Sequence, residues 1–147
     1  MADETTGSIV INAGPSEIMA VIADLATYPD WSDGVKNVEV LTEFDDGRPG
    51  DARFTIESGP IKDSYVLAYE WSGDDSVTWE LTEGGMLTAM NGCYLLTDQG
   101  DGSTLVDYRL SVGLSIPMIG MIRRKAEKVI VDTALRGLKA RVEGERA

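Results

Sequence analysis

Residues 35–114 contain six consecutive segments in which apolar and polar side chains alternate, and short turn sequences join each segment to the next. The six segments are 35–41, 52–57, 63–71, 76–82, 87–97 and 104–113. A repeat of two residues is typical of a strand with one buried face. Because short connections join antiparallel neighbours, these segments predict an antiparallel sheet. Residues 6–12 alternate in the same way and add a seventh strand.

Two other features qualify this pattern near the first strand and in the middle of the sheet. Gly14-Pro15-Ser16-Glu17 is typical of a helix start, and two short helices are expected between residues 14 and 31. Pro29 disfavours helical geometry at Tyr28, so a break is expected there. Gly92 lies inside the strand at 87–97 and predicts a bend or a bulge.

The C-terminal segment has a helical repeat instead. We expect a helix from Pro117 to about Val142, capped by Ser115, with a length of about 38 Å that can cross the whole sheet. The stripe predicted to face the sheet consists of Ile119, Ile122, Ala126, Val129, Ile130, Thr133 and Gly137. The opposite side carries Arg124, Lys125, Lys128, Asp132 and Lys139. The sequence therefore predicts one α+β domain over residues 1–147, with a seven-stranded curved antiparallel sheet around this helix.

The composition excludes several classes of function. The chain has no histidine and a single cysteine, Cys93, so the usual metal sites and the Ser-His and Cys-His catalytic pairs are missing. We expect neither a metal nor a cofactor. A net charge of −12 makes nucleic acid an improbable partner. Neither a signal peptide nor an apolar stretch long enough to span a bilayer is present, so a cytoplasmic location is expected.

Charge is distributed unevenly along the chain. Residues 117–147 carry a net charge of +4, whereas residues 1–116 carry −16. The positive charge is concentrated at Arg123, Arg124, Lys125 and Lys128. One interpretation is a solvated helix face that complements an acidic sheet. The other is a weak contact of these cations with a membrane, an anionic head group or a partner. Separately, the chain is expected to be a monomer or a dimer.

A single helix cannot cover the inner face of seven strands, so the sheet must curl around it or leave a gap. The inward side chains are large and aromatic, and several methionines accompany them in the sequence. Aromatic residues with polar ends beside methionines are typical of adaptable pockets, and equally typical of a dry core. The residues alone leave both interpretations open.

Three groups of residues carry a resemblance to a known family. The first is Asp24 with Tyr28-Pro29-x-Trp31, and the second is Gly92-x-Tyr94-x-Leu96, followed by the Asp-Gly-Ser-Thr hairpin and Val106-x-Tyr108. The third is Pro117-Met118-Ile119-Gly120. In order and spacing, the whole chain resembles the START-like (Bet v 1-like) helix-grip fold of the SRPBCC superfamily. More narrowly, it resembles the actinobacterial polyketide cyclase/dehydrase branch.

The resemblance implies a deep apolar cavity between the sheet and the C-terminal helix. The residues expected to line it are Trp31, Phe54, Ile56, Tyr65, Leu67, Trp79, Leu81, Met90, Tyr94, Tyr108, Leu110, Met118, Ile119, Ile122, Ala126, Ile130 and Thr133. The expected function is storage or transport of a hydrophobic small molecule such as a lipid or polyketide. An enzyme of the polyketide cyclase/dehydrase type, acting in the same cavity, is the first alternative, although no catalytic residue can be assigned. A protein-interaction module is the second.

Overall fold

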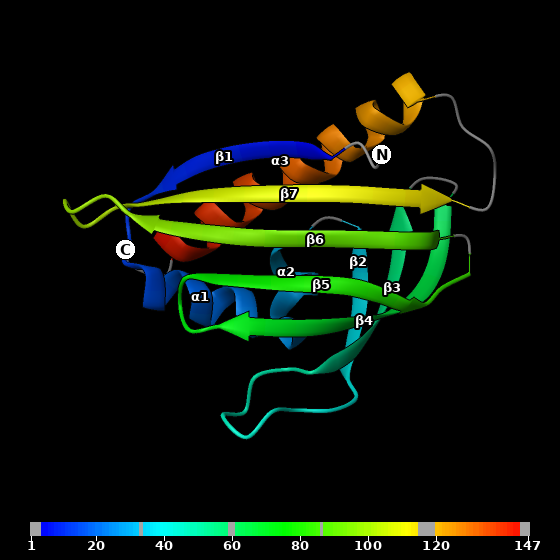
Figure 1. The fold of residues 1–147 in the computed structure, drawn as a ribbon, viewed down its shortest axis with the longest axis horizontal. Coiled ribbons are helices and arrows are strands. Elements are labelled where there is room, and N and C mark those ends of the chain that lie inside the picture. The colour runs from blue at the N-terminus through cyan, green and yellow to red at the C-terminus, as the bar shows by residue number, and fades with distance from the viewer. Residues whose placement is uncertain (1–3, 33, 59–60, 86, 115–119, 145–147) are drawn as a thin grey trace.

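The structure is a computed structural model that describes residues 4–32, 34–58, 61–85, 87–114 and 120–144. The side chains of residues 58, 61, 114, 120–123 and 126 are not described. Seven strands form one antiparallel sheet in the order β1-β7-β6-β5-β4-β3-β2. Short helices follow β1, and a long helix ends the chain, so the predicted fold class is confirmed (Figure 1).

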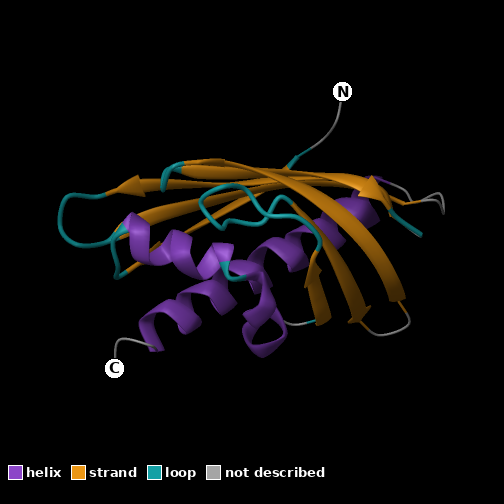
Figure 2. Ribbon diagram, turned by 90° about the horizontal axis from the view of Figure 1, so that it is seen from below, coloured by secondary structure: helices purple, strands orange, loops and turns teal. Residues whose placement is uncertain are grey.

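The strands lie close to their predicted positions. They are β1 (Thr5–Ile11), β2 (Val35–Val40), β3 (Asp51–Ser58), β4 (Ile61–Ser72), β5 (Ser76–Glu83), β6 (Leu87–Asp98) and β7 (Thr104–Leu114). From β2 to β7 each strand pairs with the next one in sequence, and β1 then pairs with β7. The sheet curves around the helices, which lie together on its concave face (Figure 2).

The helices after β1 correct one prediction. They are α1 (Pro15–Ala23), a 3-10 turn η1 (Leu25–Thr27) and α2 (Tyr28–Trp31). Tyr28 was expected to leave helical geometry, yet its φ and ψ of −53° and −39° are helical. Pro29 instead lies in the first turn of α2, where a missing N–H costs nothing. Tertiary contacts outweigh the local preference, because the Tyr28 hydroxyl donates to the Ile22 carbonyl at 2.6 Å.

Gly92 does not produce the bend or bulge that was predicted. It pairs in regular register with Trp79 on β5 and with Leu110 on β7. A Cβ atom at this position would lie 2.3 Å from Cζ2 of the Trp79 indole. Glycine is therefore present to let the indole lie against the backbone of β6.

The helix α3 (Gly120–Gly144) follows the sheet, but with a different face turned inward. Among the side chains of α3 that the structure describes, the buried ones are Glu127, Val131, Leu135, Leu138 and Val142. Val129 and Ile130, expected to face the sheet, are 59% and 39% exposed. That prediction was wrong because apolar residues lie on both sides of the helix, and periodicity could not decide between them. The predicted cap, Ser115, lies outside the described residues, as does Pro117.

The helix α3 packs against β1, an edge strand, along a line that we call the β1–α3 seam (Gly7, Val131, Lys139 and Glu143). A Cβ atom at Gly7 would lie 2.6 Å from Cγ1 of Val131, so glycine permits this close approach. Lys139 was placed on the far side of the helix, but its Nζ donates to the Val10 carbonyl on β1 at 2.8 Å. Glu143 accepts from the Asn12 N–H at 3.0 Å.

Glu127 joins the other end of α3 to the sheet. Its side chain is only 1% exposed. One carboxylate oxygen accepts from the Thr5 hydroxyl at 2.8 Å, and the other accepts from the Val112 N–H at 2.7 Å. The described part of β1 starts at Thr5, which pairs with Leu110, so Val112 lies two residues beyond this pairing. The carboxylate therefore takes the place of a strand partner for this N–H.

Replacing Glu127 by alanine should lower the free energy of unfolding by about 1–3 kcal/mol, because the buried Val112 N–H loses its acceptor. Urea denaturation measures the change. Lys128→Ala is the matched control, because its exposed pair with Asp132 contributes less than about 1 kcal/mol. Equal losses in the two variants would contradict the assigned role of Glu127.

Candidate functional site

All five tyrosines of the chain are buried on the side of the sheet that faces the helices. Together with Phe54 and Trp79 they form what we call the tyrosine cluster: Tyr28, Phe54, Tyr65, Tyr69, Trp79, Tyr94 and Tyr108. Strand alternation directs the side chains from β3 to β7 toward the same face. Tyr28 reaches them from α2, which places the cluster between the sheet and the helical layer.

The rings of the tyrosine cluster are in continuous contact. Tyr94 and Tyr108 are neighbours on paired strands, with ring centroids 4.7 Å apart in an edge-to-face arrangement. Trp79 lies 5.5 Å from each of these two rings. Phe54 stacks on Tyr65 at 5.6 Å and thereby extends the aromatic surface to β3. Such contacts fix the orientation of each ring and hence the direction of its polar end.

Most of the polar ends have no partner among the described residues. In that part of the chain, only Tyr28 of the cluster has a side-chain hydrogen bond, to the Ile22 carbonyl. Within the described residues, the hydroxyls of Tyr65, Tyr69, Tyr94 and Tyr108 and the indole N–H of Trp79 make none. Buried polar groups are nearly always hydrogen-bonded to protein or to ordered water, so these five groups need partners that the described residues do not supply.

Burial raises the pKa of each of the five phenols above the ordinary value of 10.0, and coulombic repulsion between neighbouring phenolates adds to the shift for most of them. The phenols are consequently protonated at neutral pH. A protonated hydroxyl can donate to a carbonyl or ether oxygen. The site is thus rich in neutral hydrogen-bond donors.

The sequence-predicted lining residues fall into several groups. Phe54, Tyr65, Leu67, Trp79, Met90, Tyr94, Tyr108 and Leu110 are buried together in one core. Trp31, Ile56 and Leu81 are partly buried against that core, and Thr133 is half-buried. Ile130 is exposed. Met118 and Ile119 lie outside the described residues, and the side chains of Ile122 and Ala126 are not described.

Three residues of interest were not predicted. Tyr69 shares the alternation of Tyr65 and Leu67, so the period of two could have identified it. Tyr28 lies in α2, which is only one turn long, so no helical period applies. Glu127 is a buried acid on α3, but its partner Thr5 is 122 residues away in sequence, and no local pattern marks such a contact.

Trp31 closes one side of the helical layer. Its ring centroid lies 4.7 Å from that of Tyr28. A Cβ atom at Gly137 of α3 would lie 2.6 Å from the Trp31 carbonyl oxygen, so α2 and α3 touch directly here. Trp31 is partly buried and borders the tyrosine cluster, and its place in the lining of a cavity stays a prediction.

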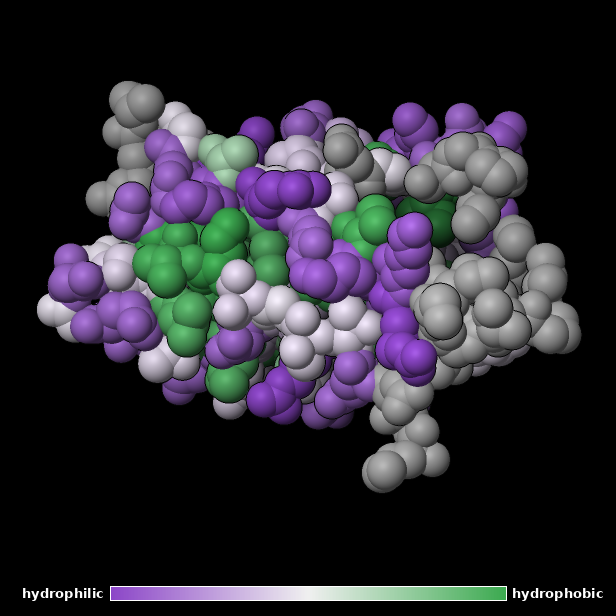
Figure 3. All heavy atoms as spheres, turned by 90° about the horizontal axis from the view of Figure 1, so that it is seen from above, coloured by the Kyte–Doolittle hydropathy of each residue, from purple (hydrophilic) through white to green (hydrophobic). Residues whose placement is uncertain are grey.

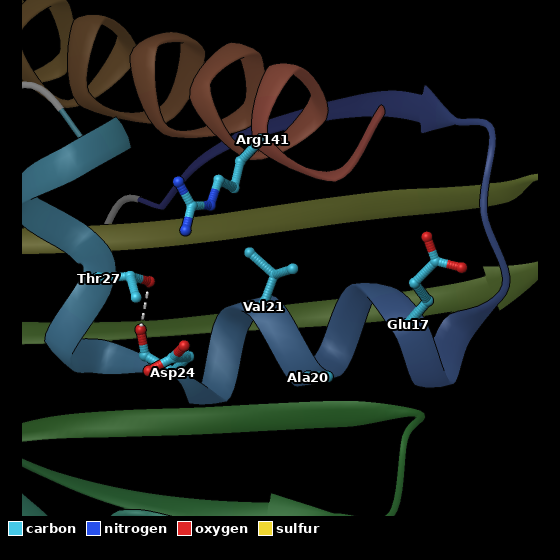
Figure 4. A pocket seen from close by; sticks show the side chains of 6 residues that line it. All are labelled: Glu17, Ala20, Val21, Asp24, Thr27 and Arg141. Atoms are coloured by element: carbon cyan, nitrogen blue, oxygen red, sulfur yellow. Dashed lines mark hydrogen bonds between the residues drawn. The ribbon is translucent and has the colours of Figure 1, made fainter. Parts of the chain in front are cut away.

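A separate groove of about 250 Å³ lies at the surface between α1 and α3 (Figure 4). It is lined by Glu17, Ala20, Val21, Asp24, Thr27 and Arg141. Thr27 donates through its hydroxyl to the Asp24 carbonyl at 2.8 Å. The groove is open and mixed in polarity, and it does not reach the tyrosine cluster.

The described ranges contain neither a cluster of metal ligands nor a membrane-spanning helix. Across them, no three Cys, Asp or Glu side chains gather closely enough to hold a metal ion. No helix within them has the length and apolar character needed to cross a bilayer.

The pH dependence of stability should reflect the buried phenols. Unfolded tyrosines ionise near pH 10, whereas the folded ones hold their protons to higher pH. Stability is therefore unaffected by tyrosine below about pH 10 and falls above it, by up to about 1.4 kcal/mol per pH unit for each phenol. Urea denaturation and phenolate absorbance between about pH 8 and pH 11 measure this. Full phenolate absorbance in folded protein near pH 10 would contradict it.

Comparison with known proteins places this geometry in a family. The sequence model of the family described as polyketide cyclase/dehydrase and lipid transport matches residues 2–143. Among proteins with curated descriptions, none matches the sequence.

Several solved structures share the fold. A START superfamily protein from Mycobacterium smegmatis has a TM-score of 0.89 and 22% identity, with 96% of this chain and 97% of that chain covered. The Zhui aromatase/cyclase from Streptomyces sp. R1128 has a TM-score of 0.83 and 12% identity, covering 100% of this chain and 97% of its own. The protein described here thus belongs to the polyketide cyclase/dehydrase and lipid-transport family and has the START-like helix-grip fold.

Proposed function

We propose that this protein binds a hydrophobic small molecule between the sheet and α3, and that the tyrosine cluster orients the molecule through its carbonyl or ether oxygens. The observation that carries the proposal is the set of buried donors at Tyr65, Tyr69, Tyr94 and Tyr108 that have no partner among the described residues. The family description, which includes both lipid transport and polyketide cyclisation, supports a ligand of this kind.

The energetics favour an uncharged ligand. A buried polar group without a partner costs about 1–3 kcal/mol, so a molecule that accepts from several of these hydroxyls recovers part of that cost on binding. The titratable side chains of the tyrosine cluster are all phenols, and burial keeps them neutral. A charged ligand would be buried against them without a counter-charge, which is strongly unfavourable.

The position of the ligand follows from the layers around it. Strands β3 to β7 supply the aromatic floor, and α2 supplies Tyr28 and Trp31 at one side. The helix α3 is the proposed boundary on the opposite side. The predicted contacts Ile122 and Ala126 lie on this helix, Met118 and Ile119 lie outside the described residues, and all four remain predictions.

Catalysis in the same place is the second candidate. Protonated phenols can stabilise the oxyanion of an enolate, as polyketide cyclisation requires. A base is also needed. The buried carboxylate of Glu127 is not suited to this task, because both of its oxygens already accept hydrogen bonds from Thr5 and Val112. Binding without chemistry is therefore the better-supported function.

Two probes of the same shape test the role of the donors. Anthraquinone is flat and carries two carbonyl acceptors, whereas anthracene has the same ring system without them. We expect tighter binding of anthraquinone, measured by quenching of tryptophan fluorescence. In the double variant Tyr94→Phe, Tyr108→Phe, the ratio of the affinities for anthraquinone and anthracene should fall by about 2- to 12-fold for each hydroxyl removed. Equal affinity for both probes in the native protein would contradict the proposed role.

The same substitutions should leave the ligand-free protein as stable as before, or more stable, because they remove buried hydroxyls that have no partner. Tyr28→Phe is the matched control. Its hydroxyl donates to the Ile22 carbonyl, so its loss should lower the free energy of unfolding by about 1 kcal/mol. Destabilisation of similar size in all three positions would show that the cluster hydroxyls are satisfied in the folded protein.

A further inference from the structure

The exposed side of α3 combines positive charge with apolar surface. Arg124, Lys125, Lys128, Val129 and Arg136 are all exposed, and we call them the basic strip. Lys125, Val129 and Arg136 recur at helical spacing and therefore share one face. Val129 is 59% exposed in the middle of this face, the highest value among the large apolar residues that are exposed in the described chain.

The cations of the basic strip are only partly neutralised. Lys128 pairs with Asp132 at 2.9 Å. Lys125 and Arg136 have no ion pair among the residues that the structure describes. The remaining acid of this half of α3, Glu127, is buried on the opposite side and bonded to β1 and β7. Its charge is therefore directed away from the exposed face.

The rest of the molecule has the opposite sign. Residues 1–116 carry a net charge of −16 and the C-terminal segment 117–147 carries +4. In an external field, such a molecule turns its C-terminal helix toward negative charge and its sheet away from it. On the β1 and α3 side of the molecule, strongly hydrophilic and apolar residues lie next to one another (Figure 3).

We propose that the basic strip docks the protein on an anionic lipid surface. Each lysine or arginine near such a surface adds to binding, and the attraction acts over roughly one Debye length, about 8 Å at physiological ionic strength. The acidic sheet lies on the far side of the molecule, where this screening weakens its repulsion. Val129 then contacts the boundary of the acyl chains, as apolar residues of interfacial helices do.

A lipid surface fits the basic strip better than a second copy of the chain does. The acidic sheet of another copy would pair with the cations but would leave Val129 against polar side chains. Such a contact joins two different surfaces and does not close on itself, so it would lead to open assemblies. The net charge of −12 on each copy opposes this association.

Docking in this orientation would bring the bilayer close to the proposed ligand site, as exchange of a ligand with the membrane requires. Ile130 lies beside Val129 and is 39% exposed, on the side of α3 that carries Thr133 and Gly137. Gly137 touches Trp31, which borders the tyrosine cluster. A bilayer on the basic strip would therefore adjoin the helix that bounds the proposed ligand site. The docking itself does not depend on that site being occupied.

Flotation with vesicles tests the docking. We expect the protein to bind vesicles of phosphatidylcholine and phosphatidylglycerol but not vesicles of phosphatidylcholine alone, and to lose binding as salt is raised. The double variant Lys125→Glu, Arg136→Glu should lower the partition coefficient by about 25-fold or more, because each cation near the surface contributes a factor of about five. Val129→Ser should weaken it further without changing the salt dependence.

The matched control is Lys36→Glu with Lys62→Glu, which changes the net charge equally at exposed positions of β2 and β4. It should retain binding, and thermal unfolding by circular dichroism should confirm that both double variants fold. Failure to bind anionic vesicles at low salt would overturn the docking. An equal loss of vesicle binding in the control variant would also overturn it. The same holds if the protein self-associates without vesicles and the Lys125 and Arg136 substitutions abolish that self-association. Probe binding in the tyrosine cluster would stand in each case.

Discussion

The close packing of α3 on β1 is the contact on which the rest of the molecule depends. β1 is an edge strand, and Gly7 lets the helix approach until Val131 lies directly against its backbone. Hydrogen bonds fix both ends of this contact: Glu127 holds β1 and β7 at one end, and Glu143 holds β1 at the other. With the helix fixed in this way, the sheet can curve around the helical layer, and its inward aromatic side chains face the helices rather than solvent.

The interior that results is unusual in its hydrogen bonding. The titratable groups of the tyrosine cluster are phenols, burial keeps them protonated, and four of the five have no partner within the described chain. A purely structural core would be expected to use phenylalanine in these places, because phenylalanine fills nearly the same volume without a buried hydroxyl. The retained hydroxyl groups are the basis of the proposed preference for neutral ligands that carry oxygen acceptors.

The sequence predicted those features that depend on local repeats. Alternation located all seven strands, and it placed Phe54, Trp79 and Tyr108 on one face because side-chain direction follows directly from position in a strand. The face of α3 was predicted wrongly, because Val129 and Ile130 are as apolar as the buried Val131 and the choice depends on where β1 lies. Glu127 was missed for the same reason. Its burial depends on Thr5 and Val112, which only the folded chain brings to it.

The contacts of Lys139 and Glu143 also protect the protein against misassembly. The Val10 carbonyl and the Asn12 N–H point outward from the free edge of β1, in the arrangement that an added strand would use. An exposed edge of this kind recruits strands from other molecules and can start fibril growth. In this protein one ion-paired turn of helix occupies both groups. Loss of the last helical turns, by proteolysis or premature termination, would therefore expose the unpaired backbone groups of the edge strand β1 while most of the sheet remained in place.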